Sequence, residues 1–285
     1  MTPTRKYFAK IEFYITNVCN LTCHRCNRFN NHNFKGWQKW ADYEQIYRSW
    51  SHYIDIDHMV ILGGEPLLNP TIVDWIYGLN DIWHRNVQVL SNGTHINHVR
   101  GLKQALQKNG NWLGISWHNM QQLDQLRGIM AEFLGSDYQE IHGKPNNKYG
   151  GDIVFGDKDG LQIPIYIQDQ FQESSIRSDW TLHNNDPIIA HEICGFAQNK
   201  CYHFIKGKLY KCGPVALMPE FDQQHALNIS DEDRQLLDQY QPLIIDDVKQ
   251  KGENFFQNLD MPIPQCKFCP AEIQPEKIYA IRKNI

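Results

Sequence analysis

The sequence has no apolar run long enough to cross a membrane. Across its 285 residues, no segment approaches the roughly 18 consecutive apolar residues that a spanning helix needs. The opening segment "MTPTRKYFAK" also lacks the apolar stretch of a secretory signal. These absences argue against a membrane protein and a secreted protein. We therefore expect a cytoplasmic protein with no membrane partner.

The sequence also lacks an excess of positive charge. Its formal net charge is −4, and charged residues make up 21% of the chain. No global basic field therefore draws the protein to nucleic acid. Internal repeats, low-complexity tracts and nucleotide-binding fingerprints are missing as well. We expect a monomer without a nucleic-acid partner, and the sequence does not identify the substrate.

Short apolar runs alternate with helical patterns over the first half of the chain. Four runs have the length and the turn-residue borders of buried strands, namely 10–16, 58–64, 86–93 and 111–118. Apolar residues recur at spacings of three and four in the segments 40–50, 72–83 and 123–133. This alternation predicts a parallel sheet whose ligand sites lie at the carboxyl ends of the strands.

Later segments give weaker signals. Residues 142–160 are rich in Gly, Asn and Asp and are expected to be irregular, whereas 161–171 has the pattern of a strand. The segment 230–240 is typical of a helix that Ser230 caps.

The eight cysteines fall into two groups. Without a secretory signal, such a set favours metal ligation or catalysis over disulfides. The first group, Cys19, Cys23 and Cys26, follows the first predicted strand in "CNLTCHRC". Three thiolates on one loop can hold three irons of a [4Fe–4S] cluster and leave the fourth iron open. The alternative is a structural zinc site, with His24 or His32 as fourth ligand.

Glycine, hydroxyl and amide residues stand at the ends of the next predicted strands. They occur in "GGEP" (63–66), "SNGT" (91–94) and "SWH" (116–118). Two glycines permit a backbone to approach a ligand closely, and the Glu65 carboxylate can pair with an ammonium group. Because parallel strands end at the same edge of a sheet, we expect these residues to gather around one ligand.

In this order, "CNLTCHRC", "LGGEPLLNP", "LSNGT" and "ISWH" resemble the motifs of the radical S-adenosylmethionine (SAM) superfamily over about residues 10–120. The resemblance implies a partial (β/α)6 TIM-like barrel, with a [4Fe–4S] cluster on the three catalytic cysteines and SAM at the open iron. The reduced cluster would split SAM into methionine and a 5′-deoxyadenosyl radical. That radical would then take a hydrogen atom from the substrate.

The resemblance also implies contacts to SAM. They are Gly63, Gly64, Glu65 and Pro66 near the methionine amino group, and Ser91, Asn92 and Ser116 near the carboxylate or the ribose. The family usually has an aromatic residue before the third cysteine, near the adenine, whereas this sequence has Arg25 there. Since a guanidinium can stack on a base, we assign Arg25 to the adenine.

The second group of cysteines comprises Cys194, Cys201, Cys212, Cys266 and Cys269. The segment "CYHFIKGKLYKCG" predicts a hairpin that turns at 206–207 and brings Cys212 back toward Cys194. This layout resembles the twitch domain, a shortened SPASM domain with an auxiliary [4Fe–4S] cluster. Five cysteines compete for four places, and we favour Cys194 over Cys201 while keeping both as candidates. A four-cysteine zinc ribbon is the alternative.

We therefore expect an α/β protein with a radical SAM core over 8–185 and a small α+β twitch domain over 186–285. The resemblance implies an oxidoreductase that modifies a small molecule or peptide, with a flavodoxin- or ferredoxin-type electron donor. One alternative is a redox-neutral reaction in which the second domain is a substrate platform, and another is a zinc-binding interaction module. Candidate substrate contacts are Gln168, Asp169, Gln170 and His183.

Overall fold

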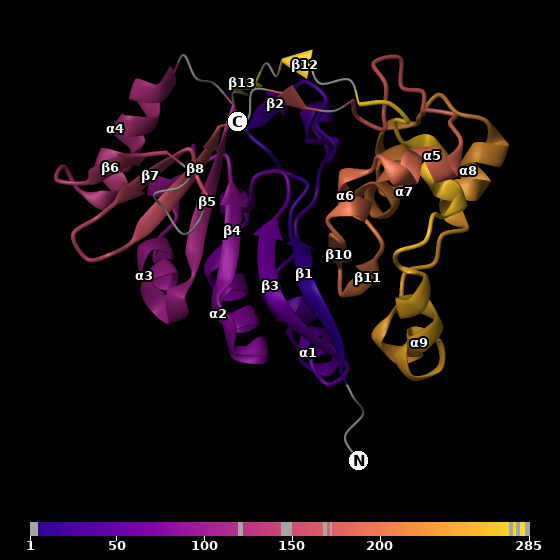
Figure 1. Ribbon diagram of the computed structural model, residues 1–285, viewed down its shortest axis with the longest axis horizontal. Helices are drawn as coiled ribbons and strands as arrows, with labels where there is room; N and C mark the ends of the chain where they lie inside the picture. The colour runs from indigo at the N-terminus through magenta and orange to yellow at the C-terminus, as the bar shows by residue number, and fades with distance from the viewer. Residues whose placement is uncertain are drawn as a thin grey trace.

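The computed structural model describes residues 5–118, 122–143, 150–167, 170–171, 173–273, 276–277 and 280–282. In these residues a nine-stranded sheet has the order β11-β10-β1-β3-β4-β5-β8-β7-β6. Figure 1 shows these strands side by side, from β6 at the left to β11 at the right. Their bounds are β1 (Lys6–Tyr14), β3 (Ile54–Leu62), β4 (Val87–Ser91), β5 (Trp112–Trp117), β6 (Gln139–His142), β7 (Ile153–Gly156), β8 (Gln162–Ile167), β10 (Tyr202–Ile205) and β11 (Lys208–Tyr210).

The central strands of the sheet are parallel. β10, β1, β3, β4, β5 and β8 pair in parallel, and β11, β7 and β6 pair antiparallel at the two sides. Helices α1 (Trp40–Trp50), α2 (Ile72–Trp83), α3 (Leu102–Gln107) and α4 (Leu123–Leu134) follow β1, β3, β4 and β5. This strand–helix alternation is the one expected from the sequence. It forms an α/β fold that is consistent with a partial barrel.

Two features differ from six consecutive strand–helix units. The segment 142–160, expected to be irregular, contains β7, because every residue of "IVFG" is buried between its two neighbouring strands. The sixth parallel strand, β10, comes from the C-terminal part of the chain and pairs with β1 rather than following β8. All four residues of β10 are buried. The added strand therefore covers an edge of β1 that would otherwise be exposed.

The expected hairpin is confirmed, with its turn at Lys206 and Gly207, whose φ angles are 51° and 72°. Phe204 of β10 packs on Phe13 and Tyr47 at ring-centroid distances of 5.4 and 5.3 Å. The hairpin therefore shares the core of the first half of the chain. The boundary near residue 185 stays a prediction.

The remaining helices lie on the β11 side of the sheet (Figure 1). Ser230 caps α8 as expected, because its side chain accepts a hydrogen bond from the Asp233 N–H. No helix in the described part of the chain combines the length and the apolar character that a membrane crossing requires. The bounds are α5 (Pro187–Glu192), α6 (Gly195–Gln198), α7 (Gly213–His225), α8 (Asp231–Asp238) and α9 (Val248–Asn258).

The two faces of β1 serve different purposes. Ile11 and Phe13 belong to the large apolar core that α1, α2 and α3 cover. Because strand side chains alternate between faces, Lys10 and Glu12 point to the opposite side of the sheet. Glu12 is nevertheless only 6% exposed, so other elements cover it there.

Two short strand pairs lie beyond the carboxyl ends of the central strands. β2 (Leu21–Cys23) pairs antiparallel with β13 (Ala280–Arg282), and β9 (Gln170–Phe171) pairs antiparallel with β12 (Glu276–Lys277). Figure 1 shows β2, β12 and β13 along the top of the molecule. The segment Ala280–Arg282 therefore lies against the loop of the first cysteine group.

The packing of the hairpin can be tested with Phe204→Ala. We expect it to lower the free energy of unfolding by about 3–5 kcal/mol, since it removes a fully buried ring. Tyr7→Ala is the control, because Tyr7 is 58% exposed, and its cost should be far smaller. Urea unfolding of the metal-free, reduced protein measures both values. Equal costs would contradict the packing of β10 into the main core.

Candidate active site

The first three cysteines lie on one loop at the carboxyl end of β1. Cys19 precedes β2, Cys23 ends it and Cys26 follows it. All three side chains are partly exposed. The backbone N–H of Leu21 donates to the Cys19 sulfur over 3.5 Å. The loop therefore presents its thiols at the edge of the sheet where the parallel strands end.

Gly63 and Gly64 allow the turn after β3 to touch the segment before the cysteine loop. The Gly64 N–H donates to the Thr16 carbonyl over 2.7 Å, and the Glu65 N–H donates to the Val18 carbonyl over 2.8 Å. A Cβ atom added to Gly63 would lie 2.5 Å from the Thr16 carbonyl oxygen. A Cβ atom added to Gly64 would lie 2.4 Å from the Val18 carbonyl oxygen. Any side chain would push the two backbones apart, so both glycines are needed to position the loop.

The Glu65 side chain links the end of β3 to the end of β4. It is fully buried, and its carboxylate accepts hydrogen bonds from the Leu67 N–H, the Ser91 hydroxyl and the Asn92 N–H at 3.0, 2.7 and 2.7 Å. Burial raises the pKa of Glu65 to about 7, although these hydrogen bonds act to lower it. The carboxylate therefore fixes two strand ends.

The same network reaches the cysteine loop. The Asn92 amide donates to the Asn20 side chain over 2.9 Å, and the Asn20 amide donates to the Thr94 hydroxyl over 2.7 Å. The structure thus joins Glu65, Ser91 and Asn92, which the sequence placed near SAM, to the loop between the first two cysteines. Thr94 belongs to the "SNGT" motif, whereas Asn20 was not singled out from the sequence.

The other residues assigned to SAM lie around this network. Pro66 is buried at the start of the 3₁₀ turn Pro66–Leu68. Ser116 lies on β5, where it pairs with Tyr166 of β8. Arg25 has a left-handed backbone, with φ at 62°, between the second and third cysteines.

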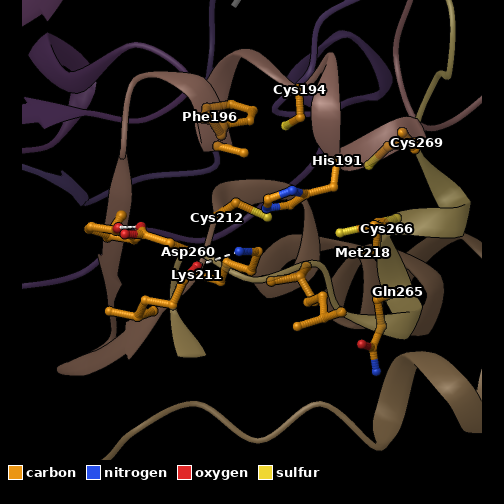
Figure 2. A pocket seen from close by; sticks show the side chains of 16 residues that line it. His191, Cys194, Phe196, Lys211, Cys212, Met218, Asp260, Gln265, Cys266 and Cys269 are labelled. Carbon is orange, nitrogen blue, oxygen red and sulfur yellow. Dashed lines mark hydrogen bonds between the residues drawn. The ribbon is translucent and has the colours of Figure 1, made fainter. Parts of the chain in front are cut away.

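Four cysteines of the second group line one cavity, which Figure 2 shows from close by. Cys194 and Cys212 stand at the starts of α6 and α7. Cys266 lies in the 3₁₀ helix Pro264–Phe268 and Cys269 directly follows it. The hairpin brings the segment of Cys212 to the segment of Cys194, as expected.

Burial disfavours the thiolate forms of Cys212, Cys266 and Cys269. Burial, with smaller effects of Cys194 and Cys266, raises the pKa of Cys269 to about 12, although its hydrogen bond with Ser175 acts to lower it. Burial also raises the pKa of Cys212 well above its usual value, with Cys269 as the next cause. A cation bound among these thiols would favour their thiolate forms. The donor set therefore fits a four-cysteine [4Fe–4S] cluster.

Cys201 lies elsewhere. Its side chain is only 4% exposed. Burial, followed by the charge of Glu12, raises the pKa of Cys201 to about 12. Of the two candidates for the fourth place, the structure puts Cys194 with the other three thiols.

In the described residues, no three His, Cys, Asp or Glu side chains are arranged to hold a single metal ion.

A second cavity, of about 450 Å³, lies between the two groups of cysteines. Arg25 and Asn27 of the first loop line it on one side, and Cys194 and Cys269 line it on the other. Lys10, Glu12 and Cys201 contribute to its wall, together with the apolar side chains of Ile193 and Phe196. Its volume is within the range of small-molecule sites.

Glu12 is the centre of a charged cluster beside this cavity. Its carboxylate lies 2.6 Å from Arg28, 2.8 Å from His203 and 3.1 Å from Lys10. Although burial acts to raise it, these neighbours, Arg28 foremost, hold the pKa of Glu12 well below its usual range. Burial, followed by Arg28, lowers the pKa of His203 to about 4. Sequence reasoning missed this cluster, whose one signal is a carboxylate within the apolar strand "KIEFYIT".

His191 and Lys211, which line the cavity of the four thiols, were missed as well. Their signals are the short segments "HEIC" and "YKCG", which place each of them close to a cysteine.

Among the expected substrate contacts, Gln168 and Asp169 lie outside the described residues, as does the side chain of Gln170. His183 is buried, with its Nε2 atom 3.0 Å from the Ser174 carbonyl oxygen.

The raised pKa of Glu65 predicts a pH dependence of stability. Because the folded state holds the proton more tightly, this group's contribution is complete below about pH 4.5 and is lost as the pH rises through about 7. Glu65→Gln should remove that slope. The free energy of unfolding of the native protein relative to the variant should fall by up to about 3 kcal/mol over this window. Urea unfolding of the metal-free protein from pH 4 to 8 tests this, and a constant difference would contradict it.

Comparison with known proteins identifies the first part of the chain. Residues 13–145 match the profile of the Radical SAM superfamily. The probable GTP 3′,8-cyclase of Methanothermobacter thermautotrophicus is 31% identical over 100 residues, which cover 35% of this chain and 32% of that protein. The chain thus matches about a third of the length of this curated relative.

Among solved structures, Streptococcus suis SuiB bound to S-adenosylmethionine aligns with 45% of this chain and 39% of its own, at 15% identity and a TM-score of 0.28. That similarity is too low to indicate a shared reaction. The profile match is more informative, because it spans the cysteine loop, the glycine turn and the strand ends described above. The comparisons therefore support a radical SAM domain over residues 13–145 of the chain.

Proposed function

We propose that this radical SAM enzyme oxidises a small molecule or peptide held between its two groups of cysteines. The observation that supports this most is the cavity of about 450 Å³, which Arg25 of the first loop and Cys194 and Cys269 of the second group line together. A substrate in this cavity would contact the loop of the first cysteine group and two thiols of the second group. Lys10 and Arg25 offer it hydrogen-bond donors, and Ile193 and Phe196 offer it apolar contacts.

The residues at the carboxyl edge of the sheet fit a [4Fe–4S] cluster and SAM. Cys19, Cys23 and Cys26 supply three thiolates, and their loop contains no fourth cysteine. When bound, the cluster supplies the electron that cleaves SAM, and the resulting 5′-deoxyadenosyl radical takes a hydrogen atom from the substrate. The chain's own contribution is to hold the cysteine loop on the glycine turn and to offer polar groups of Asn92 and Ser116 to SAM.

Cys194, Cys212, Cys266 and Cys269 would hold an auxiliary [4Fe–4S] cluster. When bound with four cysteines, such a cluster supplies a one-electron acceptor beside the substrate cavity. The substrate would give up one hydrogen atom to the radical, one electron to the acceptor and one proton to a base or to water, and the acceptor would pass its electron on to an oxidised external protein carrier. The product is therefore oxidised by two electrons for each SAM cleaved, and a flavodoxin- or ferredoxin-type protein supplies the electron for cleavage.

Cys201 supports a second candidate, a redox-neutral reaction. Its thiol lines the substrate cavity, and burial next to Glu12 keeps it protonated. A thiol can return a hydrogen atom to a carbon radical because an S–H bond is weaker than most C–H bonds. An electron from the protein reductant and a proton would then restore the thiol. This reaction leaves the oxidation state of the substrate unchanged.

The ligand assignment is tested by iron content. The anaerobically reconstituted protein should bind about eight irons, which corresponds to two [4Fe–4S] clusters. Cys194→Ala should bind about half as much, whereas Cys201→Ala should match the native protein. Iron and zinc analysis of the three proteins gives the answer. Zinc in place of iron would favour a zinc-binding interaction module. Loss of iron in Cys201→Ala but not in Cys194→Ala would make Cys201, rather than Cys194, the fourth ligand.

The radical step is tested by the formation of 5′-deoxyadenosine from SAM and dithionite. Cys23→Ala should lower its rate at least about 100-fold, because one ligand of the first cluster is lost. A true substrate, sought among small molecules and peptides, should raise the rate in the native enzyme. One oxidised product should form per 5′-deoxyadenosine, as measured by chromatography and mass spectrometry.

The two candidate reactions differ in the product. A product in the oxidation state of the substrate, formed by the native enzyme but not by Cys201→Ala, would replace the oxidative reaction by the redox-neutral one. The radical step itself would be untouched by that result.

A further inference from the structure

We propose that His191 and Lys211 raise the reduction potential of the auxiliary cluster, His191 through an N–H hydrogen bond to a cluster sulfur and Lys211 through its buried positive charge. The inference rests on the proposed function, because it requires a cluster on Cys194, Cys212, Cys266 and Cys269. It adds the residues that make this cluster an effective electron acceptor.

His191 lies among the four thiols of the cavity that Cys194, Cys212, Cys266 and Cys269 line. It belongs to the last turn of α5, three residues before Cys194. Its ring lines the cavity together with the four thiols, and Figure 2 shows it among the labelled cysteines. The Nε2 atom is buried and has no hydrogen-bond partner in the described structure. An unsatisfied buried donor costs about 1–3 kcal/mol, so a partner is expected inside the cavity.

A cluster sulfur is the partner that this place offers. Four cysteines complete the ligand set of a [4Fe–4S] cluster, so the histidine is not required as a ligand. The Nε2 atom can carry a proton whether the ring is neutral or charged, and it can therefore act as a donor in both states. A donor aimed at a cluster sulfur stabilises the more negative, reduced state.

Lys211 adds a charge at the same site. Its side chain is 7% exposed, it precedes Cys212 in the chain, and its ammonium group donates to the Leu259 carbonyl. Burial lowers the pKa of Lys211, whereas the neighbouring Cys266, Cys212, Asp260 and Cys194 act to raise it. Asp260 is itself bonded to Lys200 and Tyr202, so its charge is shared with groups outside the cavity.

The two residues act in the same direction. Reduction adds one negative charge to the cluster, and both an N–H donor and a nearby cation stabilise that charge more strongly than they stabilise the oxidised state. Because the surroundings are buried, the effect is larger than it would be in water. The auxiliary cluster should therefore accept an electron from the substrate more readily than its four cysteines alone would allow.

A redox titration of the reconstituted holoenzyme, followed by electron paramagnetic resonance in the presence of SAM, tests the proposal. His191→Phe should make electron uptake by the auxiliary cluster about tenfold less favourable, a shift of about −59 mV for one electron. Lys211→Met should shift the midpoint in the same direction. His191→Gln keeps an N–H donor, so its midpoint potential should lie between those of His191→Phe and the native protein. His52→Phe, at an exposed position, is the control and should match the native protein.

The outcomes separate this proposal from the one on which it rests. An unmoved or more positive midpoint in His191→Phe, at full iron content, would overturn the role of His191 and leave the auxiliary cluster in place. Loss of the auxiliary iron in both His191→Phe and His191→Gln would show a ligand or a structural support, and would also overturn it. A native protein with only the first cluster would refute the proposed function itself.

Discussion

The close approach of two backbones decides where the chemistry of this protein takes place. Gly63 and Gly64 lie against Thr16 and Val18 so tightly that a single Cβ atom would separate them. This contact carries the cysteine loop to the carboxyl edge of the sheet, and the buried carboxylate of Glu65 fastens the next strand end to the same point. The glycines and the glutamate of the family motif therefore have a structural purpose in this chain besides any contact with SAM.

The second half of the chain is tied to this edge through β1. Because β10 pairs in parallel with β1, the hairpin that precedes Cys212 is part of the main sheet. Glu12 adds a polar link, since it binds Arg28 from the first cysteine loop and His203 from β10. The spacing of the two thiol groups is thus set by one strand and by one ion cluster. The pairing of β10 with β1 and the Glu12 ion cluster therefore hold the two sides of the cavity at a fixed distance from each other.

Local patterns in the sequence were sufficient for the central strands, for α1, α2, α4 and α8, and for the two groups of cysteines, but not for β7, which lies in a segment expected to be irregular. The hairpin turn at 206–207 and the Ser230 cap were predicted because short-range hydrogen bonds determine them. The pairing of β10 with β1 was not, since a hairpin signal describes only the antiparallel partner. The choice between Cys194 and Cys201 was open for a similar reason, as it depends on thiols that arrive from far along the chain. The roles of His191 and Glu12 depend on burial, which spacing does not reveal.

The pairing of β2 with β13 has a consequence for biogenesis. The strand that ends at Cys23 pairs with Ala280–Arg282, which the ribosome makes long after the first thiol loop. During synthesis the first thiol loop can be complete while its neighbour strand does not yet exist. Iron and sulfide delivery can then precede the closing of this side, so the order of translation itself provides a time window for maturation.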